Sequence, residues 1–271
     1  MGWIATSPVG DRGMQKDALP RAVWRAVAGR ANVARLRPSV KRSVDVVVAL
    51  AALAAILPLL LLIAAAIKLD SPGPVLYRVR RVGYRGRTLM MFKFRKMYHD
   101  AAGIPLTANA DDRLTRVGRV LARTRLDELP QLWDVLRGRM SIVGPRPEDP
   151  GFVALHADDY EWILSVRPGM TGLSQLAYAE ERKILDEDDL VGDYVARVLP
   201  QKIGLDILYA GSYRIRMDVA VIWWTLVTVM LRRPVAVHRS TGRMNLRKRV
   251  ARPVVVPETC AVTEQPLVEA A

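Results

Sequence analysis

The sequence is poor in the residues that proteins use for cross-links and for zinc sites. Its 271 residues include one cysteine, Cys260, and three widely spaced histidines, His99, His156 and His238. A single cysteine excludes an intramolecular disulfide, and the spacing of the histidines gives no zinc cluster. Any bound metal is therefore expected to be held by carboxylates, which together with substrate phosphates are typical ligands of Mg²⁺.

Acidic residues are also scarce relative to basic ones. The chain has 41 Lys and Arg against 27 Asp and Glu, a net charge of +14. This charge favours an anionic partner and leaves open nucleic acid, a phosphorylated ligand or acidic lipid head groups. Apolar residues make up 51% of the chain, enough for a sizeable core, so disorder throughout is excluded.

Residues 1–40 are predicted to form a basic extension. Val23, Trp24, Val27 and Ala31 recur at helical spacing among arginines. This pattern is typical of an amphipathic helix on an anionic membrane surface. A flexible basic tail is the alternative that the sequence leaves open.

Residues 41–69 are predicted to insert into a membrane. Val46–Ile67 contains no charged residue and as a straight helix would reach roughly 33 Å, enough for a bilayer core. Pro58 lies in the middle and should kink the helix. Lysines and arginines flank both ends, and such residues tend to stay cytoplasmic. The pattern therefore favours a reentrant helix that returns to the same face; a kinked spanning helix is the alternative.

The region after this segment is predicted to begin with a β-hairpin, with strands at Val75–Val79 and Thr88–Phe94 and a loop at Gly83–Gly86. Its basic residues suit either phosphate contact or solubility at a sheet edge. They are Arg78, Arg80, Arg81, Arg85, Arg87, Lys93 and Arg95.

The remaining chain is predicted to be mainly helical. Residues 117–137 have helical spacing with an interruption near Thr124 and a stop at Gly138. Three further segments are predicted in chain order: an irregular Ser141–Pro147, a helix at Tyr160–Val166 followed by a turn at Arg167–Gly172, and a solvated acidic stretch at Glu180–Asp193.

The last apolar run, Val219–Leu231, is too short to span a bilayer and contains Trp223 and Trp224. An interfacial or buried helix is expected there. Residues 232–271 are predicted to be a basic, loosely ordered tail. The domain organisation is thus an extension, a membrane helix, a catalytic domain at 70–231 and a tail.

Two adjacent carboxylates, Asp127 and Glu128, are the strongest candidates for chemistry. Helical spacing of the apolar residues around them predicts a helix that begins near Thr124, where Thr124 and Asp127 could form a capping box without any chemistry. The alternative is catalytic, because an ionised carboxylate can bind Mg²⁺ or attack phosphorus. Arg146, between two prolines, offers a guanidinium suited to phosphate oxygens.

These residues lie in motifs that resemble the bacterial sugar transferase family, the monotopic polyprenyl-phosphate phosphoglycosyl transferases. The resemblance covers about Lys41 to Leu231. Its motifs follow in order: Lys41–Asp45, the apolar segment with Pro58, Ser71–Val75, Arg81–Gly83, Lys93–Met97, Asp112–Gly118, Asp127–Leu132, Met140–Pro147 and Arg167–Leu173.

The resemblance implies a mainly α fold with a small β-hairpin (α+β), a reentrant helix kinked at Pro58 and a cytosolic catalytic domain with interfacial amphipathic helices. It also implies transfer of a sugar-1-phosphate from a UDP-sugar to undecaprenyl phosphate. In that reaction the carboxylate of Asp127 attacks the β-phosphate, and the lipid phosphate then attacks the phosphosugar-aspartyl intermediate. Such a step would begin exopolysaccharide, capsule or glycoconjugate synthesis.

By the same resemblance, Mg²⁺ lies at Asp127, Glu128 assists catalysis and seven residues contact the substrate. These are Lys93, Arg95, Arg113, Pro145, Arg146, Pro147 and Arg167. The expected partners are the UDP-sugar, polyprenyl phosphate and lipids of the bacterial inner (cytoplasmic) membrane, with the catalytic domain facing the cytoplasm. No nucleic acid is expected, and a homodimer is left open.

Three residues depart from the family pattern. Lys96 stands at a usual threonine, Asp134 at a usual asparagine and Arg139 at a usual acidic residue. The charge reversal at Arg139 raises an alternative, a homologue without activity that serves as a scaffold. A second alternative is a membrane-anchored protein that binds nucleic acid or anionic lipid without catalysis, which the net charge motivates.

Overall fold

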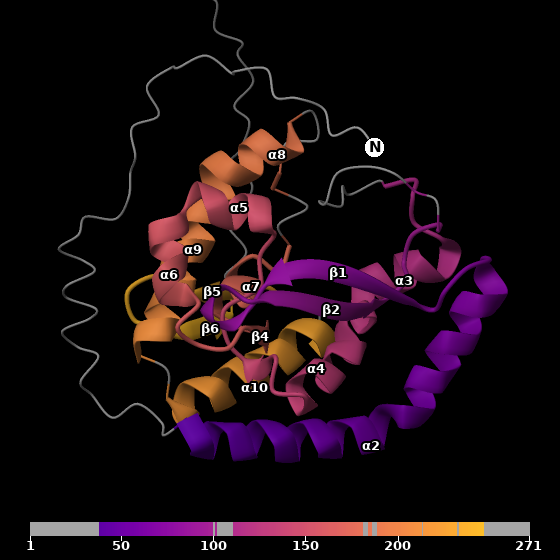
Figure 1. Ribbon diagram of the computed structural model, residues 1–271, viewed down its shortest axis with the longest axis horizontal. Helices are drawn as coiled ribbons and strands as arrows, with labels where there is room; N and C mark the ends of the chain where they lie inside the picture. Colours follow the sequence, from indigo (N-terminus) through magenta and orange to yellow (C-terminus); the bar gives the residue numbers. More distant parts are fainter. Residues whose placement is uncertain are drawn as a thin grey trace, which may run out of the picture.

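The computed structural model describes residues 38–99, 101, 111–180, 184–185, 189–212, 214–231 and 233–246. Helices dominate this part of the chain, which also forms three two-stranded sheets (Figure 1). Residues 1–37 of the predicted N-terminal extension and residues 247–271 of the predicted tail lie outside the described residues. The prediction of a mainly α fold with a small β-hairpin is confirmed.

Helix α2 (Pro38–Asp70) runs along one face of the molecule and bends in its course (Figure 1). Among the described residues it is the one helix long and apolar enough to cross a membrane. Pro58 lies inside it. Before Pro58, Ala49 packs in a cluster with Val135; after it, Ile63 and Ile67 pack in another cluster with Leu121. The two halves therefore rest on different parts of the same domain.

Both ends of α2 are tied to that domain by polar contacts. Near the start, Arg42 donates to the carbonyl oxygens of Val135 and Leu136. At the end, the carboxylate of Asp70 accepts the backbone N–H of Val117 at 3.0 Å. A long apolar helix thus begins and ends against one folded unit.

The predicted hairpin is present as β1 (Leu76–Val82) and β2 (Thr88–Phe94), antiparallel, with the 3₁₀ turn η1 (Tyr84–Gly86) between them. Three short elements follow: α3 (Arg116–Thr124), the 3₁₀ turn η2 (Leu126–Gln131) and α4 (Leu132–Leu136). Thr115 caps α3, since its hydroxyl accepts the N–H of Gly118. The interruption near Thr124 and the stop at Gly138, which has a φ of +75°, are confirmed.

Two of the segments predicted to lack regular structure form a small parallel sheet. Strands β3 (Ser141–Val143) and β4 (Gly169–Thr171) pair in parallel, so the prediction of an irregular segment and a turn was wrong at these residues. The reason is the close approach of two backbones: a Cβ on Gly169 would lie 2.1 Å from the nitrogen of Gly144. Glycine makes this pairing possible, and the sequence pattern does not reveal it.

The rest of the domain packs around one long helix. Helix α9 (Leu199–Ser212) contacts its neighbours on several sides, with Leu199 and Tyr209 buried. Its neighbours are α6 (Ala157–Ile163), α7 (Leu173–Ala177) and the π-helical turn η4 (Tyr194–Val198). Helix α5 (Pro150–Leu155) contacts α6, and α8 (Leu190–Asp193) contacts η4. Helix α6 confirms a helix near Tyr160 but ends at Ile163, three residues before the predicted end.

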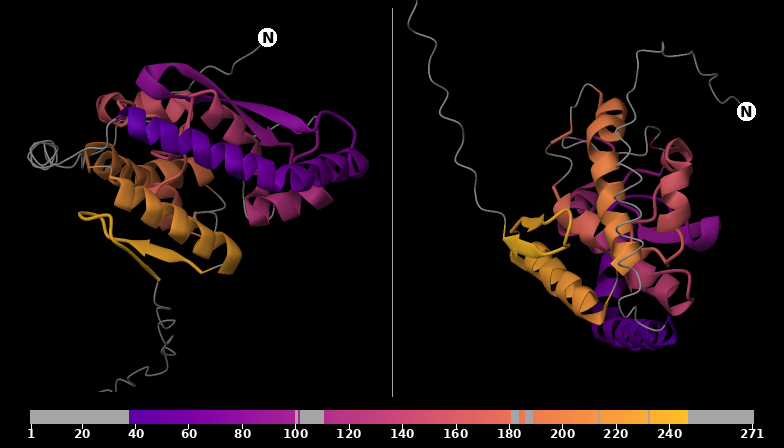
Figure 2. Two further views of the ribbon diagram at one scale, coloured as in Figure 1. Left: turned by 90° about the horizontal axis from the view of Figure 1, so that it is seen from below. Right: turned by 90° about the vertical axis from the view of Figure 1, so that its left-hand side faces the viewer.

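The last helix and a second hairpin complete the fold. Helix α10 (Ile215–Leu231) begins four residues earlier than expected and lies beside the start of α2 (Figure 2), where Lys41 and Asp218 are 2.6 Å apart. Val221 is buried, whereas Trp223 and Met230 are exposed. Strands β5 (Val235–Val237) and β6 (Met244–Leu246) pair antiparallel. The prediction of a loosely ordered tail was therefore wrong at these residues, because Val235 packs into the core.

Candidate active site

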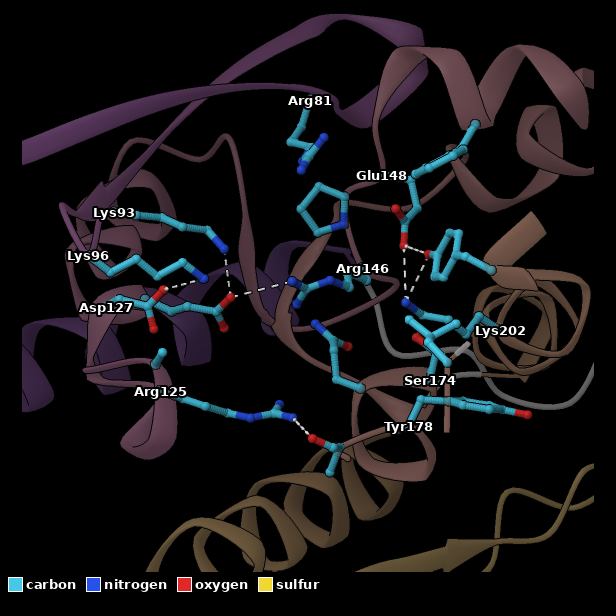
Figure 3. Close-up of a pocket in the computed structure, with 18 residues that line it drawn as sticks. Arg81, Lys93, Lys96, Arg125, Asp127, Arg146, Glu148, Ser174, Tyr178 and Lys202 are labelled. Atoms are coloured by element: carbon cyan, nitrogen blue, oxygen red, sulfur yellow. Dashed lines mark hydrogen bonds and ion pairs between the residues drawn. The ribbon is translucent and has the colours of Figure 1, made fainter. Parts of the chain in front are cut away.

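A pocket of ≈ 160 Å³ lies between the β1–β2 hairpin, η2 and α9 (Figure 3). Its wall is strongly charged. Asp127, Glu128, Lys93, Lys96, Arg125 and Arg146 lie at one end, and Glu148, Tyr194, Lys202, Ser174, Gln175 and Tyr178 line the rest. A cavity with this many cations suits a polyanionic ligand.

The two carboxylates are presented by a sharp change in backbone direction. Arg125 adopts a left-handed conformation with φ of 58°, which ends α3 and starts the 3₁₀ turn η2. Leu126 and Leu129 of η2 pack toward α2 in the cluster that contains Ile63. The apolar side of the turn is thus held on α2, and Asp127 and Glu128 line the pocket.

The alternative of a capping box is contradicted by the structure. Thr124 ends α3 rather than starting a helix, and its hydroxyl donates back to the carbonyl oxygen of Val120 at 2.8 Å. The prediction of a helix start near Thr124 was wrong. The leucines do have helical spacing, but the left-handed residue Arg125 separates α3 from η2, so the spacing does not belong to one continuous helix.

The charges around the carboxylates are ordered. The Nζ of Lys93 lies 2.8 Å from the Oε1 of Glu128, and the guanidinium of Arg146 lies 3.5 Å from the same oxygen. Burial opposes ionisation of Glu128, but the charges of Lys93 and Arg146 outweigh it and lower the pKa of this carboxyl well below its usual range. Glu128 is therefore a fixed anion that holds two cations in place.

Asp127 has a different environment. Its side chain is almost fully buried, and the Nζ of Lys96 lies 3.9 Å from its Oδ2. Burial, followed by the charge of Glu128, raises the pKa of Asp127, while the cations Lys93, Lys96 and Arg146 act in the opposite direction. A carboxylate that is poorly solvated and not bidentately paired keeps the basicity that a nucleophile needs.

The donor set can be tested for Mg²⁺ by its chemistry. Among the described residues no group of three or more His, Cys, Asp or Glu side chains converges on one point. The described residues therefore do not form a metal site made of protein ligands alone. Mg²⁺ is commonly bound by one or two carboxylates together with substrate phosphates. Asp127 beside a cationic pocket fits that mode, in which the phosphates complete the coordination.

Three of the seven expected substrate contacts line the pocket, namely Lys93, Arg146 and Pro147. Pro145 is buried just behind them, where its carbonyl oxygen accepts the N–H of Gly169 at 2.8 Å. It holds the turn against β4 rather than facing the cavity.

The other three arginines lie elsewhere. Arg95 is buried and donates to the carbonyl oxygens of Ser71 and Pro72, so it fixes the chain that leaves α2. Arg113 is held by Asp111, with two nitrogens 2.8 and 2.6 Å from its carboxylate. The guanidinium of Arg167 donates to the carbonyl oxygen of Gly138 and lies over the ring of Tyr84. None of these three lines the pocket.

Two of the three departures from the family pattern pair with each other. Arg139 Nε lies 3.5 Å from Oδ1 of Asp134. The Asp134 side chain is fully buried, and its other oxygen, Oδ2, accepts the N–H of Phe92 at 3.3 Å. The charge reversal at Arg139 therefore accompanies a new acid, and neither residue lines the pocket. The third departure, Lys96, lies in the pocket beside Asp127.

Sequence reasoning missed the other end of the pocket. Glu148 directly follows the Pro145–Pro147 turn, so its position in the chain was an available signal. Lys202 lies on α9, Tyr194 on η4 and Ser174 on α7, and no local pattern marks them. Lys202 is 3% exposed, and the sequence of the helix does not predict that its lysine is buried.

Comparison with known proteins finds several similar to this chain. One similar protein is the undecaprenyl-phosphate glucose phosphotransferase of Komagataeibacter xylinus, 39% identical over 195 residues, which cover 69% of this chain and 35% of that protein. Another is the exopolysaccharide production protein PSS of Rhizobium leguminosarum bv. phaseoli, 39% identical over 201 residues, 71% of this chain and 96% of that protein.

A third is the UDP-glucose:undecaprenyl-phosphate glucose-1-phosphate transferase of Caulobacter vibrioides, 37% identical over 195 residues, 70% of this chain and 69% of that protein. The chain thus spans about a third of the first relative's length but nearly all of the second's. Residues 36–232 match the family model described as bacterial sugar transferase, and the chain belongs to that family.

Proposed function

We propose that this protein transfers a sugar-1-phosphate from a UDP-sugar to undecaprenyl phosphate at the inner membrane. The observation that carries the proposal is the placing of Asp127 and Glu128 in one pocket with Lys93, Lys96 and Arg146. A diphosphate carries negative charge that such cations would bind, and the pair of carboxylates supplies a nucleophile. The relatives' names, which include UDP-glucose and undecaprenyl phosphate, support the substrates.

The reaction would proceed in two displacements at the same phosphorus. A carboxylate oxygen of Asp127 forms a bond to the β-phosphorus, and the bond from that phosphorus to the bridging oxygen breaks. UMP leaves with the bridging oxygen and its electron pair. An oxygen of the lipid phosphate then bonds to phosphorus, the bond to Asp127 breaks, and the carboxylate is regenerated.

The surrounding residues would position and neutralise charge. Lys93 and Arg146, held by Glu128, lie where phosphate oxygens would bind, and Lys96 lies beside the attacking carboxylate. Fixed cations stabilise a transition state in which charge spreads over the phosphoryl oxygens. Bound Mg²⁺ would add Lewis-acid stabilisation of the same oxygens, with Asp127 as its protein ligand.

A reentrant arrangement of α2 would bring the lipid to this pocket. Both ends of α2 contact the same domain, and its exposed apolar side chains include Val47, Leu61 and Leu62. With the domain on the cytoplasmic side, the helix would enter the bilayer, bend at Pro58 and return. Leu126 and Leu129 join the carboxylate turn to α2, so the reaction would take place at the membrane surface.

The test is release of UMP from a UDP-sugar by the full chain in membranes containing polyprenyl phosphate and Mg²⁺. Asp127→Asn keeps the side chain's size but removes the nucleophile, and we expect UMP release to fall by at least about 10³-fold. Arg123→Gln, on the exposed side of α3, is the control and should retain activity. Wild-type turnover in Asp127→Asn would exclude Asp127 as the nucleophile.

A further inference from the structure

A buried polar group occupies the end of the pocket away from Asp127. The Nζ of Lys202 lies 3.0 Å from the hydroxyl of Tyr194 and 3.4 Å from the Oε1 of Glu148, and the Tyr194 hydroxyl donates to that same oxygen at 3.0 Å. Lys202 and Glu148 are 3% and 8% exposed. Burying a lysine and a carboxylate costs more than an apolar pair would, so this pair is a candidate for a function beyond packing.

The position of this group relative to Asp127 restricts what it can contact. In the close-up, Arg146 lies between Asp127 on one side and Glu148 and Lys202 on the other (Figure 3). Arg146 also contacts Glu128, the neighbour of Asp127. If the diphosphate binds at Arg146, one end of the donor lies at Asp127 and the other extends toward Lys202.

In-line displacement decides which end that is. The attacking oxygen and the leaving oxygen lie on opposite sides of the phosphorus. When Asp127 attacks the β-phosphorus, the bridging oxygen, the α-phosphate and the nucleoside therefore extend away from Asp127. The sugar is attached to the β-phosphate through an oxygen that lies to the side of this axis. The nucleoside is thus the part of the donor that points toward Lys202.

We propose that Lys202 and Glu148 form the subsite that binds the pyrimidine base of the donor and selects uracil over cytosine. This inference rests on the proposed function and adds base recognition to it. Uracil presents the acceptor O4 beside the donor N3–H, whereas cytosine presents the donor N4 beside the acceptor N3. Lys202 offers donors and Glu148 offers acceptors. The ribose and phosphate fix the orientation of the base, so its donor and acceptor edges cannot be exchanged. Lys202 and Glu148 therefore match uracil and not cytosine.

Tyr194 holds the pair in register. Its hydroxyl accepts from Lys202 and donates to Glu148, and its ring lies 4.9 Å from the Nζ of Lys202. Discrimination by paired polar groups is strong, because cytosine would set its N4 donor against the donor Lys202 and its N3 acceptor against the acceptor Glu148. Tyr194 is therefore a positioning residue, and Lys202 and Glu148 make the contacts.

Binding of UMP and CMP to the full chain in detergent, measured by titration calorimetry, tests the proposal. The wild type should bind UMP more tightly than CMP. Lys202→Met removes the donor at similar length, and we expect the affinity for UMP to fall about tenfold while that for CMP changes little. Glu148→Gln should lower the same preference without removing the side chain's bulk. Inorganic pyrophosphate, which reports the phosphate end, should bind all three proteins equally.

Lys41→Met is the matched control. It removes another lysine from a partly buried ion pair, with Asp218, outside the pocket. The preference for UMP over CMP should survive in this variant. Thermal unfolding of each variant shows whether it is folded. If Lys202→Met does not fold, Glu148→Gln tests the same base preference.

Three results would overturn the proposal: no preference for UMP in the wild type, an unchanged preference in both variants, or an equal loss of UMP and pyrophosphate binding. A variant that binds UMP normally but accepts different UDP-sugars would assign the pair to the sugar instead. Failure of the proposed function has a separate signature, since UMP binding needs no catalysis. In that case the wild-type chain would release no UMP from any UDP-sugar, while the preference for UMP over CMP remained.

Discussion

Burial and nearby charges shift the pKa values of the neighbouring carboxyls Asp127 and Glu128 in opposite directions. Glu128 is in hydrogen-bond contact with Lys93, which together with Arg146 lowers its pKa. Asp127 is one residue away, yet burial and the charge of Glu128 raise its pKa. The same pair of side chains therefore provides one permanent anion and one basic carboxylate. Environment, rather than residue type, assigns the two roles.

The pH dependence of UMP release should report this arrangement. The proposed attack requires an ionised Asp127, so we expect activity to fall as pH falls through the pKa of Asp127, which lies above the usual 3.8. Lys96→Met removes a cation that lowers this pKa, so the acid limb of kcat/KM should move to higher pH. Arg123→Met, outside the pocket, should leave it in place. An unmoved limb in Lys96→Met would show that Asp127 does not control the acid side.

At the scale of elements, close backbone approaches hold the site together. Helix α3 lies so near the end of β2 that a Cβ on Gly118 would be 1.8 Å from the carbonyl oxygen of Lys96. That oxygen also accepts the N–H of Thr115 at 3.1 Å. The position of Lys96, and thus of the cation beside Asp127, depends on the absence of a side chain at residue 118.

Gly118→Ala should therefore destabilise the fold. Overpacking at this contact is expected to cost about 1–3 kcal/mol and to lower the midpoint of thermal unfolding. Gly151→Ala is the control, because it is also a helical glycine but its Cβ would meet nothing closer than Oδ1 of Asp149 at 3.5 Å. It should change stability by less than about 0.5 kcal/mol. Equal melting temperatures for the two variants would contradict the packing argument.

At the scale of the whole molecule, the anchoring of α2 supports the proposed reentrant topology. The helix is anchored at its start through Asp45, whose carboxylate accepts from Ser141 and from the N–H of Ile142. Its end is anchored through Asp70. Between these anchors, apolar side chains are exposed. A helix that crossed a bilayer fully would place its two ends about 30 Å apart on opposite faces, which the shared anchoring disfavours.

Site-specific labelling tests this topology. In a Cys260→Ser background, Ser39→Cys and Pro74→Cys place thiols at exposed positions on either side of the helix. We expect an impermeant thiol reagent to label both from the cytoplasmic side of membrane vesicles and neither from the outer side. The Cys260→Ser chain without added cysteine measures background. Labelling from opposite faces would mean that α2 spans the bilayer.

The sequence by itself determined the long apolar helix, the β1–β2 hairpin and the pairing of Asp127 with Glu128, because these depend on local runs of residues and on adjacent positions. It also indicated Lys93, Arg146 and Pro147, which lie in short motifs. Only the tertiary structure decided that Arg95, Arg113 and Arg167 serve the scaffold, since an arginine's partners are not encoded locally. It alone brought Lys202 to Glu148, and β3 to β4. Those contacts join segments distant in the chain, where no periodicity connects one partner to the other.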